Sequence, residues 1–317
     1  MILLVNGNTR QRYPYTHGWI RVCASFVLLL FLTDLNAQQD WLYTQGHFDL
    51  FGSNEAFAGH SEGINTTVRL REQWVGFEGS PSTQFLSIHS PVYKKLSLGG
   101  KLMYDRLGAQ QRFSGKLAAS YAVTLGDGSL RFGLGAGWLN QKIRSDRLIT
   151  QFEEIGLDYI GRSGNAVNLS GGLFYITDFW YVGVQGDNLN SPKLYADSNY
   201  DLQPVFTLMG GLVIELNDQV AIKPSIVWRE AVNGQSDGDL GLALLLKNKI
   251  WIGGGYRYNS SAYGLLQFRF SERFQAGYSY DFTVSKLAGY ESGSHELFLS
   301  YVFGKSGIDQ ASIRYFR

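Results

Sequence analysis

The chain has 317 residues, of which 44% are hydrophobic and 17% are charged, and its formal net charge is +1. This composition excludes a disordered chain, and the balanced charge gives no support for binding nucleic acid or another polyanion. Glycine is abundant at 38 residues, proline is scarce at 6, and aromatic residues reach 15%, which favours β-structure with many turns over a helical bundle.

The amino-terminal segment has the features of a cleaved secretory signal peptide. Three arginines precede an apolar run over residues 22–32, and the small residue Ala37 follows shortly afterwards. The run covers about eleven residues, roughly half of what a membrane-spanning helix needs. We therefore predict a signal peptide over 1–37. Its removal would take away Cys23, the only cysteine, and with it any disulfide or cysteine-based metal site.

Downstream of Ala37 the sequence divides into blocks of about ten residues in which large apolar residues alternate with small or charged ones. In Tyr278–Phe282, for example, the aromatic side chains point to one face while Ser279 and Asp281 point to the other. This length and this period of two are typical of transmembrane β-strands. We count about fourteen such strands, which begin near Ile64, Thr83, Lys95, Gln111, Ser129, Asn165, Phe179, Pro204, Gln219, Ser236, Lys249, Ala262, Arg273 and Glu291.

The connections between these strands differ in length according to their position in the order. Connections after even-numbered strands are tight, as at 126–128 and 247–249, whereas 144–164 and 187–203 follow odd-numbered strands. Bacterial outer-membrane barrels have short periplasmic turns and longer external loops. The pattern predicts an all-β protein, an antiparallel up-and-down transmembrane β-barrel.

The predicted barrel covers 63–304. An amino-terminal periplasmic segment over 38–62 precedes it, and a carboxy-terminal tail over 305–317 follows it. A soluble β-sandwich shows the same alternation, but at this length it would need two domains, and no linker-like boundary interrupts the chain. Many positions on the polar face are glycine, which suits a crowded lumen better than a solvent-exposed surface.

Several short motifs, spread over the whole mature chain, carry a family resemblance: Asn54–Gly59, Arg71–Thr83, Ser87–Pro91, Asp105–Gly108, Tyr280–Leu287, Gly293–Leu297 and Arg314–Phe316. Together they resemble the PorP/SprF family of type IX secretion membrane proteins from Bacteroidetes. Glu55 stands where the family motif has proline, and Phe57 where it has tyrosine. The resemblance implies an outer-membrane barrel of the secretion and gliding machinery that docks periplasmic components or anchors an exported surface protein.

Two other classes of function remain as alternatives to this one. A diffusion porin or a transporter of hydrophobic compounds would have an open lumen. An outer-membrane hydrolase would need a histidine beside a nucleophile, but His89–Ser90 and Ser294–His295 are adjacent pairs whose side chains point to opposite faces of a strand. The sequence also has no HExxH, GxSxG or P-loop motif. We therefore expect no catalytic residue, no metal and no cofactor.

The segment that follows the first predicted strand is a candidate plug or partner surface. It combines aromatic, charged and turn-forming residues in a pattern that alternation alone does not require: Arg71, Trp74, Gly76, Phe77, Glu78, Gly79 and Pro81. Anchoring in the aromatic girdle of the membrane interface is the alternative explanation. Anchoring explains Trp74 but not the turn at 78–81, and both interpretations stay open.

Alternation also predicts which charged side chains face the lumen, since a Lys or Arg facing lipid near the midplane costs about 2–4 kcal/mol. These side chains either form a network of ion pairs that stiffens the barrel or provide a basic path or socket for an acidic segment. The candidates are Arg69, Lys101, Asp105, Arg131, Lys223, Arg257, Arg269, Asp281 and Glu296.

Overall fold

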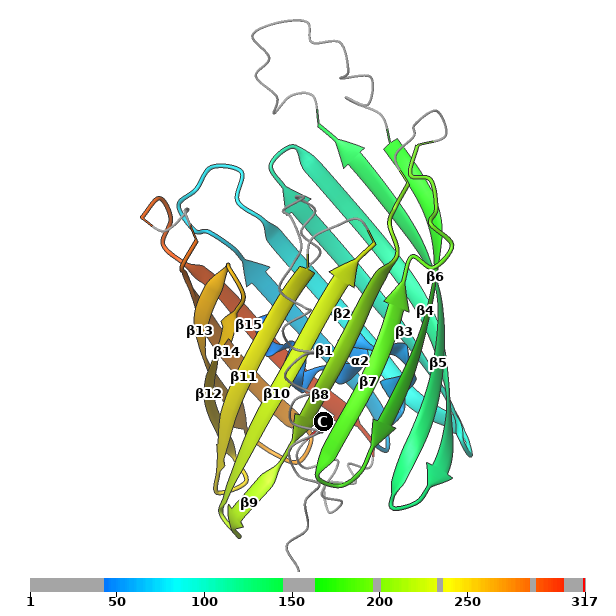
Figure 1. Ribbon diagram of the computed structural model, residues 1–317, viewed down its shortest axis with the longest axis vertical. Helices are drawn as coiled ribbons and strands as arrows, with labels where there is room; N and C mark the ends of the chain where they lie inside the picture. Colours follow the sequence, from blue (N-terminus) through cyan, green and yellow to red (C-terminus); the bar gives the residue numbers. More distant parts are fainter. Residues whose placement is uncertain are drawn as a thin grey trace, which may run out of the picture.

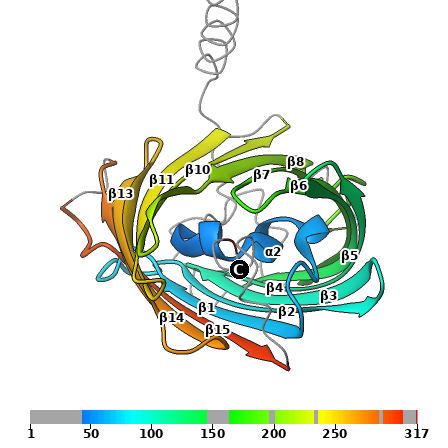
Figure 2. The same ribbon diagram turned by 90° about the horizontal axis from the view of Figure 1, so that it is seen from below.

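The computed structural model describes residues 43–144, 163–195, 201–232, 236–285, 289–304 and 316. These residues form a closed antiparallel β-barrel with a short helical segment inside it (Figures 1 and 2). The predicted signal peptide lies outside the described residues, and so does the predicted tail apart from Phe316. Within the described ranges, no helix is both long enough and apolar enough to cross a membrane.

The wall of the barrel has fourteen strands, which confirms the number predicted from the sequence. One of them is divided in two, because β8 and β9 both pair with β10 and are separated by Val213. Pairing of β1 with β15 closes the ring. The strand segments are β1 (Ile64–Glu72), β2 (Ser82–Tyr93), β3 (Leu96–Leu107), β4 (Gln110–Leu125), β5 (Gly128–Ile143), β6 (Ser163–Ile176), β7 (Trp180–Asp187), β8 (Val205–Leu212), β9 (Ile214–Asn217), β10 (Val220–Ala231), β11 (Ser236–Leu246), β12 (Ile250–Arg257), β13 (Ser261–Arg269), β14 (Phe274–Thr283) and β15 (Ser294–Phe303).

Successive side chains along each strand point alternately into the lumen and out of the barrel. In β15, Glu296 and Phe298 are buried, whereas Leu297, Leu299 and Tyr301 are exposed. The period of two follows from strand geometry. Because the outward positions are predominantly large apolar residues, the barrel presents an apolar surface of the kind that faces lipid.

The two rims of the barrel differ in the length of their connections, as the sequence predicted. The lower rim in Figure 1 carries tight turns, such as the one where Lys247 and Asn248 both have positive φ angles of 52° and 54°. Two adjacent positive φ values are typical of the type I′ hairpin turn. The upper rim carries the longer connections, including 73–81 and the described residues 188–195 and 201–204 between β7 and β8. We call these the short-turn rim and the long-loop rim.

Three short helices lie inside the lumen, visible in blue when the barrel is seen along its axis (Figure 2). They are η1 (Thr44–Phe48), α2 (Leu50–Ser53) and η2 (Glu55–Phe57), and we call residues 44–57 the lumen plug. The sequence led us to expect a periplasmic segment over 38–62. The structure differs, because the polar groups of residues 44–57 are buried against partners that lie on the barrel strands.

Candidate functional site

The lumen plug begins at a cluster of charged residues on β1, β14 and β15. The backbone N–H groups of Thr44 and Gln45 donate to the two carboxylate oxygens of Glu296, at 2.9 and 3.0 Å. Arg71 donates to Glu296 Oε2 at 3.0 Å and to Asp281 Oδ2 at 2.6 Å. Asp281 also accepts from Thr44 Oγ1 at 2.7 Å. The two N–H groups at the start of η1 are thus both satisfied by the buried carboxylate of Glu296.

The next turn of the plug is held by β10, β11 and β13. His47 Nε2 lies 2.9 Å from Asp239 Oδ1, which also accepts from the hydroxyl of Tyr263 at 2.7 Å. Lys223 donates from Nζ to the carbonyl of His47 at 2.9 Å. Arg257 joins this cluster to the first one, since it donates to both Asp239 and Asp281 at 3.1 Å.

Arg69 fixes the middle of the plug from β1 and is fully buried. Its guanidinium carbon lies 3.8 Å from the ring centroid of Tyr43 and 4.2 Å from that of Phe85. Its Nη2 lies 3.2 Å from Asp49 Oδ2. Asp49 in turn accepts from the backbone N–H of Gly52 through its other oxygen. Stacking between two rings and pairing with one carboxylate is a geometry that suits Arg better than Lys.

Glu55, in η2, joins the plug to β3 and β4. Its Oε1 accepts from Lys101 Nζ at 3.3 Å and from Lys116 Nζ at 3.1 Å, and Lys116 also contacts Asp187 at 2.5 Å. Burial by itself raises the pKa of the Glu55 carboxyl, but the two ammonium groups outweigh burial and lower this pKa to about 2. Glu55 is therefore ionised in the folded barrel at neutral pH.

The end of the plug is fitted against the wall through its backbone. Asn54 caps η2 by accepting from Ala56 N–H at 2.9 Å, and its amide donates to the carbonyls of Leu173 and Val184. Arg131 donates to the carbonyl of Ala56 at 2.9 Å. Backbone lies so close here that a Cβ added at Gly133 would stand 2.2 Å from the nitrogen of Ala56.

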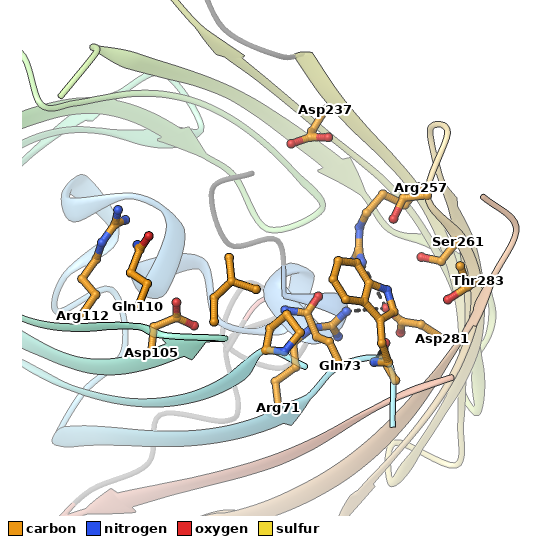
Figure 3. A pocket seen from close by; sticks show the side chains of 15 residues that line it. Arg71, Gln73, Asp105, Gln110, Arg112, Asp237, Arg257, Ser261, Asp281 and Thr283 are labelled. Atoms are coloured by element: carbon orange, nitrogen blue, oxygen red, sulfur yellow. Dashed lines mark hydrogen bonds and ion pairs between the residues drawn. The ribbon is translucent and has the colours of Figure 1, made fainter. Parts of the chain in front are cut away.

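Above the plug, on the side of the long-loop rim, two cavities remain in the lumen. The rim cavity has a volume of about 120 Å³ and is lined by Arg71, Trp74, Asp105, Arg112, Asp237, Arg257 and Asp281 together with several polar residues. Figure 3 shows Arg71, Arg257 and Asp281 on one side of it and Asp105, Gln110 and Arg112 on the other. The second, which we call the basic cavity, measures about 150 Å³ and is lined by Lys101, Arg112, Lys116, Arg229 and Asp187 and by an apolar wall. Arg112 lines both cavities.

Comparison with known proteins gives the context for this lumen. The model of the family described as type IX secretion system membrane protein PorP/SprF matches residues 35–301. The chain belongs to this family. A search of curated proteins found no match.

Among solved structures, this PorP/SprF protein is similar to the toluene transporter TbuX of Ralstonia pickettii, with a TM-score of 0.51 and 11% identity over 81% of this chain and 94% of that one. It is also similar to the outer-membrane protein Omp33 of Acinetobacter baumannii, with a TM-score of 0.45 and 10% identity over 77% of this chain and all of that one. At such low identity the first likeness supports the fold alone, that of an outer-membrane β-barrel.

The charged residues that alternation assigned to the lumen all point inward in the PorP/SprF barrel. Eight of them are at most 9% exposed, and the side chain of Lys101 is 10% exposed. Seven of them form hydrogen bonds or ion pairs with residues of the plug: Arg69, Lys101, Arg131, Lys223, Arg257, Asp281 and Glu296. Asp105 accepts from Thr83, and Arg269 donates to the carbonyl of Asn248 near the short-turn rim.

The segment singled out as a candidate plug or partner surface lies at the long-loop rim. Arg71 points into the lumen, whereas the loop at 73–81 joins neighbouring loops through its backbone. Val75 N–H donates to the carbonyl of Gly293, and Gly108 N–H donates to that of Gly79. Trp74 and Pro81 line the rim cavity. The plug itself is built by residues 44–57 and not by this segment.

Sequence reasoning missed the plug because its helices are three to five residues long, too short to produce a periodic pattern. The signal that could have revealed it is the set of inward glycines. Gly99, Gly133 and Gly172 each leave space that a plug residue, Phe51, Ala56 or Asn54, occupies.

The histidines considered as catalytic candidates have structural contacts. His89 is buried, and its Nδ1 accepts from the N–H of Gly59, where the chain leaves the plug. His295 Nδ1 lies 2.6 Å from the hydroxyl of Tyr278. These contacts explain both side chains by packing, and the family is one of secretion-system membrane proteins.

Proposed function

We propose that this barrel is a non-enzymatic component of the type IX secretion and gliding machinery that anchors an exported surface protein at the outer membrane or docks periplasmic components of the machine. The observation that supports this most directly is the asymmetry of the lumen. Residues 44–57 occupy the lumen and contact strands around it, while cavities remain on their long-loop side. A lumen that is filled by a plug and concave towards one rim suits holding a partner better than passing solutes.

A diffusion porin would need a continuous aqueous path, and the packing of the plug disfavours it. Plug residues contact strands around the barrel, among them β1, β3, β5, β6, β11 and β15. Many of these contacts involve buried charges, and breaking a buried ion pair costs several kcal/mol. The similarity to a toluene transporter concerns the fold alone and does not indicate a transport pathway through this barrel.

The test compares surface display of exported proteins with the amount of folded barrel in the same cells. The double variant Trp74→Ala, Pro81→Ala changes the loop at the long-loop rim that lines the rim cavity. We expect heat-modifiable barrel on SDS gels to stay within about twofold of wild type while display of the partner falls several-fold. Trp138→Ala is the matched control, since Trp138 is an exposed aromatic on the outer face of β5.

Two outcomes would contradict this role of the loop. A parallel fall of barrel and display would reduce the loop to a structural anchor in the membrane interface. Unchanged display would leave it without a role in the partner interaction. Deleting the whole gene with no effect on any exported protein would overturn the proposed function itself.

A further inference from the structure

We propose that the outward face of β3, β4 and β5 at the long-loop rim binds a phosphorylated glycolipid of the outer membrane, with Arg106 and Lys142 as the groups that hold its phosphate. Long loops face the cell exterior in barrels of this architecture, so the lipid belongs to the outer leaflet. The site lies on the membrane side of the wall, outside the lumen, and is independent of the proposed docking role.

Arg106 and Lys142 are the only lysine or arginine side chains on the described strands that point away from the lumen. Each of the others is buried in the lumen or lines one of its cavities. Both outward cations stand one residue before the end of their strand, since β3 ends at Leu107 and β5 at Ile143. An outward charge costs about 2–4 kcal/mol at the membrane midplane but only about 0–1 kcal/mol near the interface. These two positions are therefore ones where a cation can meet a lipid headgroup.

Strand pairing places the two cations in one row across the wall, where β3, β4 and β5 lie side by side (Figure 1). Arg106 pairs with Gln111 on β4, and Gln111 pairs with Lys142 on β5. Neighbouring strands are about 4.8 Å apart, so the two cationic residues are separated by about 10 Å of backbone with one amide side chain between them. Their long side chains can approach a single anion from two sides.

Neither of the two cations has a protein partner within the described ranges, in which no hydrogen bond or ion pair involves the side chain of Arg106 or Lys142. The carboxylate in the same row is that of Glu72 on β1, which pairs with Ser82, which in turn pairs with Arg106. Glu72 accepts from Ser82 Oγ at 2.5 Å. Because it stands two strands from Arg106 and four from Lys142, the row keeps a positive end at β3 to β5.

This positive patch is confined to one sector of the barrel. On β12 and β14, the residues one position before the strand end at the same rim are Tyr256 and Phe282, and both are exposed. Aromatic side chains at these places belong to the girdle that marks the membrane interface. The girdle explains Tyr256 and Phe282 but not a pair of unpartnered cations, whereas clustered cations beside a bilayer attract anionic headgroups.

The aromatic residues below the two cations indicate that the anion belongs to a lipid. Tyr104, Phe113 and Trp138 point outward from β3, β4 and β5 and are exposed. The ring centroids of Phe113 and Trp138 lie 6.1 Å apart. Such rings sit at the level where headgroups meet acyl chains. Arginine binds phosphate oxygens through two parallel N–H groups, and lysine adds a point charge.

Amide side chains beside the cations favour a lipid whose headgroup contains sugars. Asn140 on β5 pairs with Asn165 on β6, and its amide donates to the side-chain oxygen of Asn165 at 3.1 Å. Gln111 lies between the two cations. Each amide offers both donors and an acceptor, which suits the hydroxyl groups of a saccharide. A simple phospholipid has few hydroxyl groups to use them.

Native mass spectrometry of the purified full-length mature barrel in detergent micelles tests the site, with EDTA present to remove divalent cations. The probes are diphosphoryl lipid A, the same lipid A after removal of its phosphates, and phosphatidylglycerol. We expect diphosphoryl lipid A to bind at least tenfold more tightly than either of the other two, because only this probe combines phosphate with a saccharide.

Charge variants connect the binding to the two cations. The double variant Arg106→Gln, Lys142→Gln should weaken diphosphoryl lipid A at least tenfold. The exchange Arg106→Lys, Lys142→Arg keeps both charges and should retain most of the affinity. The control Lys249→Gln, Arg273→Gln removes one lysine and one arginine from exposed turns at the short-turn rim and should change the affinity less than twofold. Heat-modifiable migration on SDS gels verifies that each variant is folded.

Three outcomes would overturn the proposal. Equal binding of the two forms of lipid A would show that phosphate is not recognised. Unchanged affinity in the folded double variant would place the lipid elsewhere on the barrel. Phosphatidylglycerol that bound as tightly as diphosphoryl lipid A would make the patch a site for any anionic lipid, and the assignment to a glycolipid would be wrong.

Discussion

Glu55 shows how a single carboxylate can organise the interior of this barrel. Lys101 on β3 and Lys116 on β4 are directly paired positions of neighbouring strands, so two ammonium groups would repel each other inside the lumen. Glu55 accepts from both of them. The wall supplies one carboxylate to this pair, that of Asp187 beside Lys116, and the plug supplies the second. Removal of Glu55 or of either lysine leaves buried charge behind.

This arrangement predicts an acid-dependent loss of stability that Glu55→Gln abolishes. The pKa of Glu55 is lowered in the folded protein to about 2, below its ordinary value of 4.5. A group whose pKa is lowered on folding stabilises the folded state at pH values above its unfolded pKa. This contribution is lost as the pH falls from about 4.5 through 2. The shift corresponds to on the order of 3 kcal/mol at neutral pH.

Urea unfolding followed by tryptophan fluorescence checks this prediction at pH 7 and at several values below 5. The difference in the free energy of unfolding between wild type and Glu55→Gln should shrink as the pH falls to 2. Glu72→Gln is the control, since Glu72 lies at the end of β1 and accepts from Ser82 Oγ. An unchanged difference at low pH would mean that Glu55 is not the group that titrates.

At the scale of elements, the plug consists of helices that are too short to be stable alone. An isolated helix of fewer than about twelve residues is marginal in water, and η1, α2 and η2 have five, four and three residues. Their partners are distant in sequence, as with Thr44 and Asp281, which are 237 positions apart. The plug therefore takes its conformation from the wall, and its helices exist only where the barrel has closed.

Gly133→Ala should displace the end of the plug while leaving the wall intact. The added Cβ would stand within 2.6 Å of the backbone of Glu55 and Ala56, so η2 must move. Gly264→Ala is the matched control in another strand, because a Cβ there meets nothing within 4 Å. Limited proteolysis measures the outcome: we expect cleavage within 44–57 to become at least several-fold faster in Gly133→Ala only. Equal rates in both variants would show that η2 is not seated against β5.

At the scale of the molecule, the wall and the plug have separate roles. The wall closes through β1 and β15 and satisfies its own backbone hydrogen bonds. The plug fills the lumen through polar contacts and through an apolar cluster in which Phe48 packs on Trp251 and Phe57 on Phe174. Since the outer face is apolar and the charged residues face the lumen, removing the plug would expose the lumen charges to water without exposing the membrane to them.

Deletion of residues 44–57 should accordingly convert the barrel into a conducting pore. In planar bilayers we expect the full-length protein to show little conductance and the deletion variant to show stable open channels, with heat-modifiable migration on SDS gels as the check on folding. Equal conductance of the two folded proteins would contradict the assignment of 44–57 as the seal of the lumen.

The sequence by itself determined the barrel. Alternation with a period of two marked the strands, and short connections after even-numbered strands fixed their antiparallel order. These features are local, because the side chains on the two faces of each strand match the lumen on one side and the lipid on the other. The same alternation directed Arg69, Lys223 and Glu296 inward. Small differences remain at strand ends, as where β15 begins at Ser294 and not near Glu291.

Only the tertiary structure decided what fills the lumen. Residues 44–57 have no periodicity, and the sequence pointed to 71–81 because that segment combines unusual residues. Which of the two segments fills the lumen depends on which of them contacts the charged side chains that the strands direct inward. Asp49, Glu55 and Asn54 find their partners on β1, β3, β4, β6 and β7, and strands so far apart in the chain face one lumen only once the ring is closed. A segment whose position is set by contacts across a closed barrel shows no periodic pattern in its own sequence.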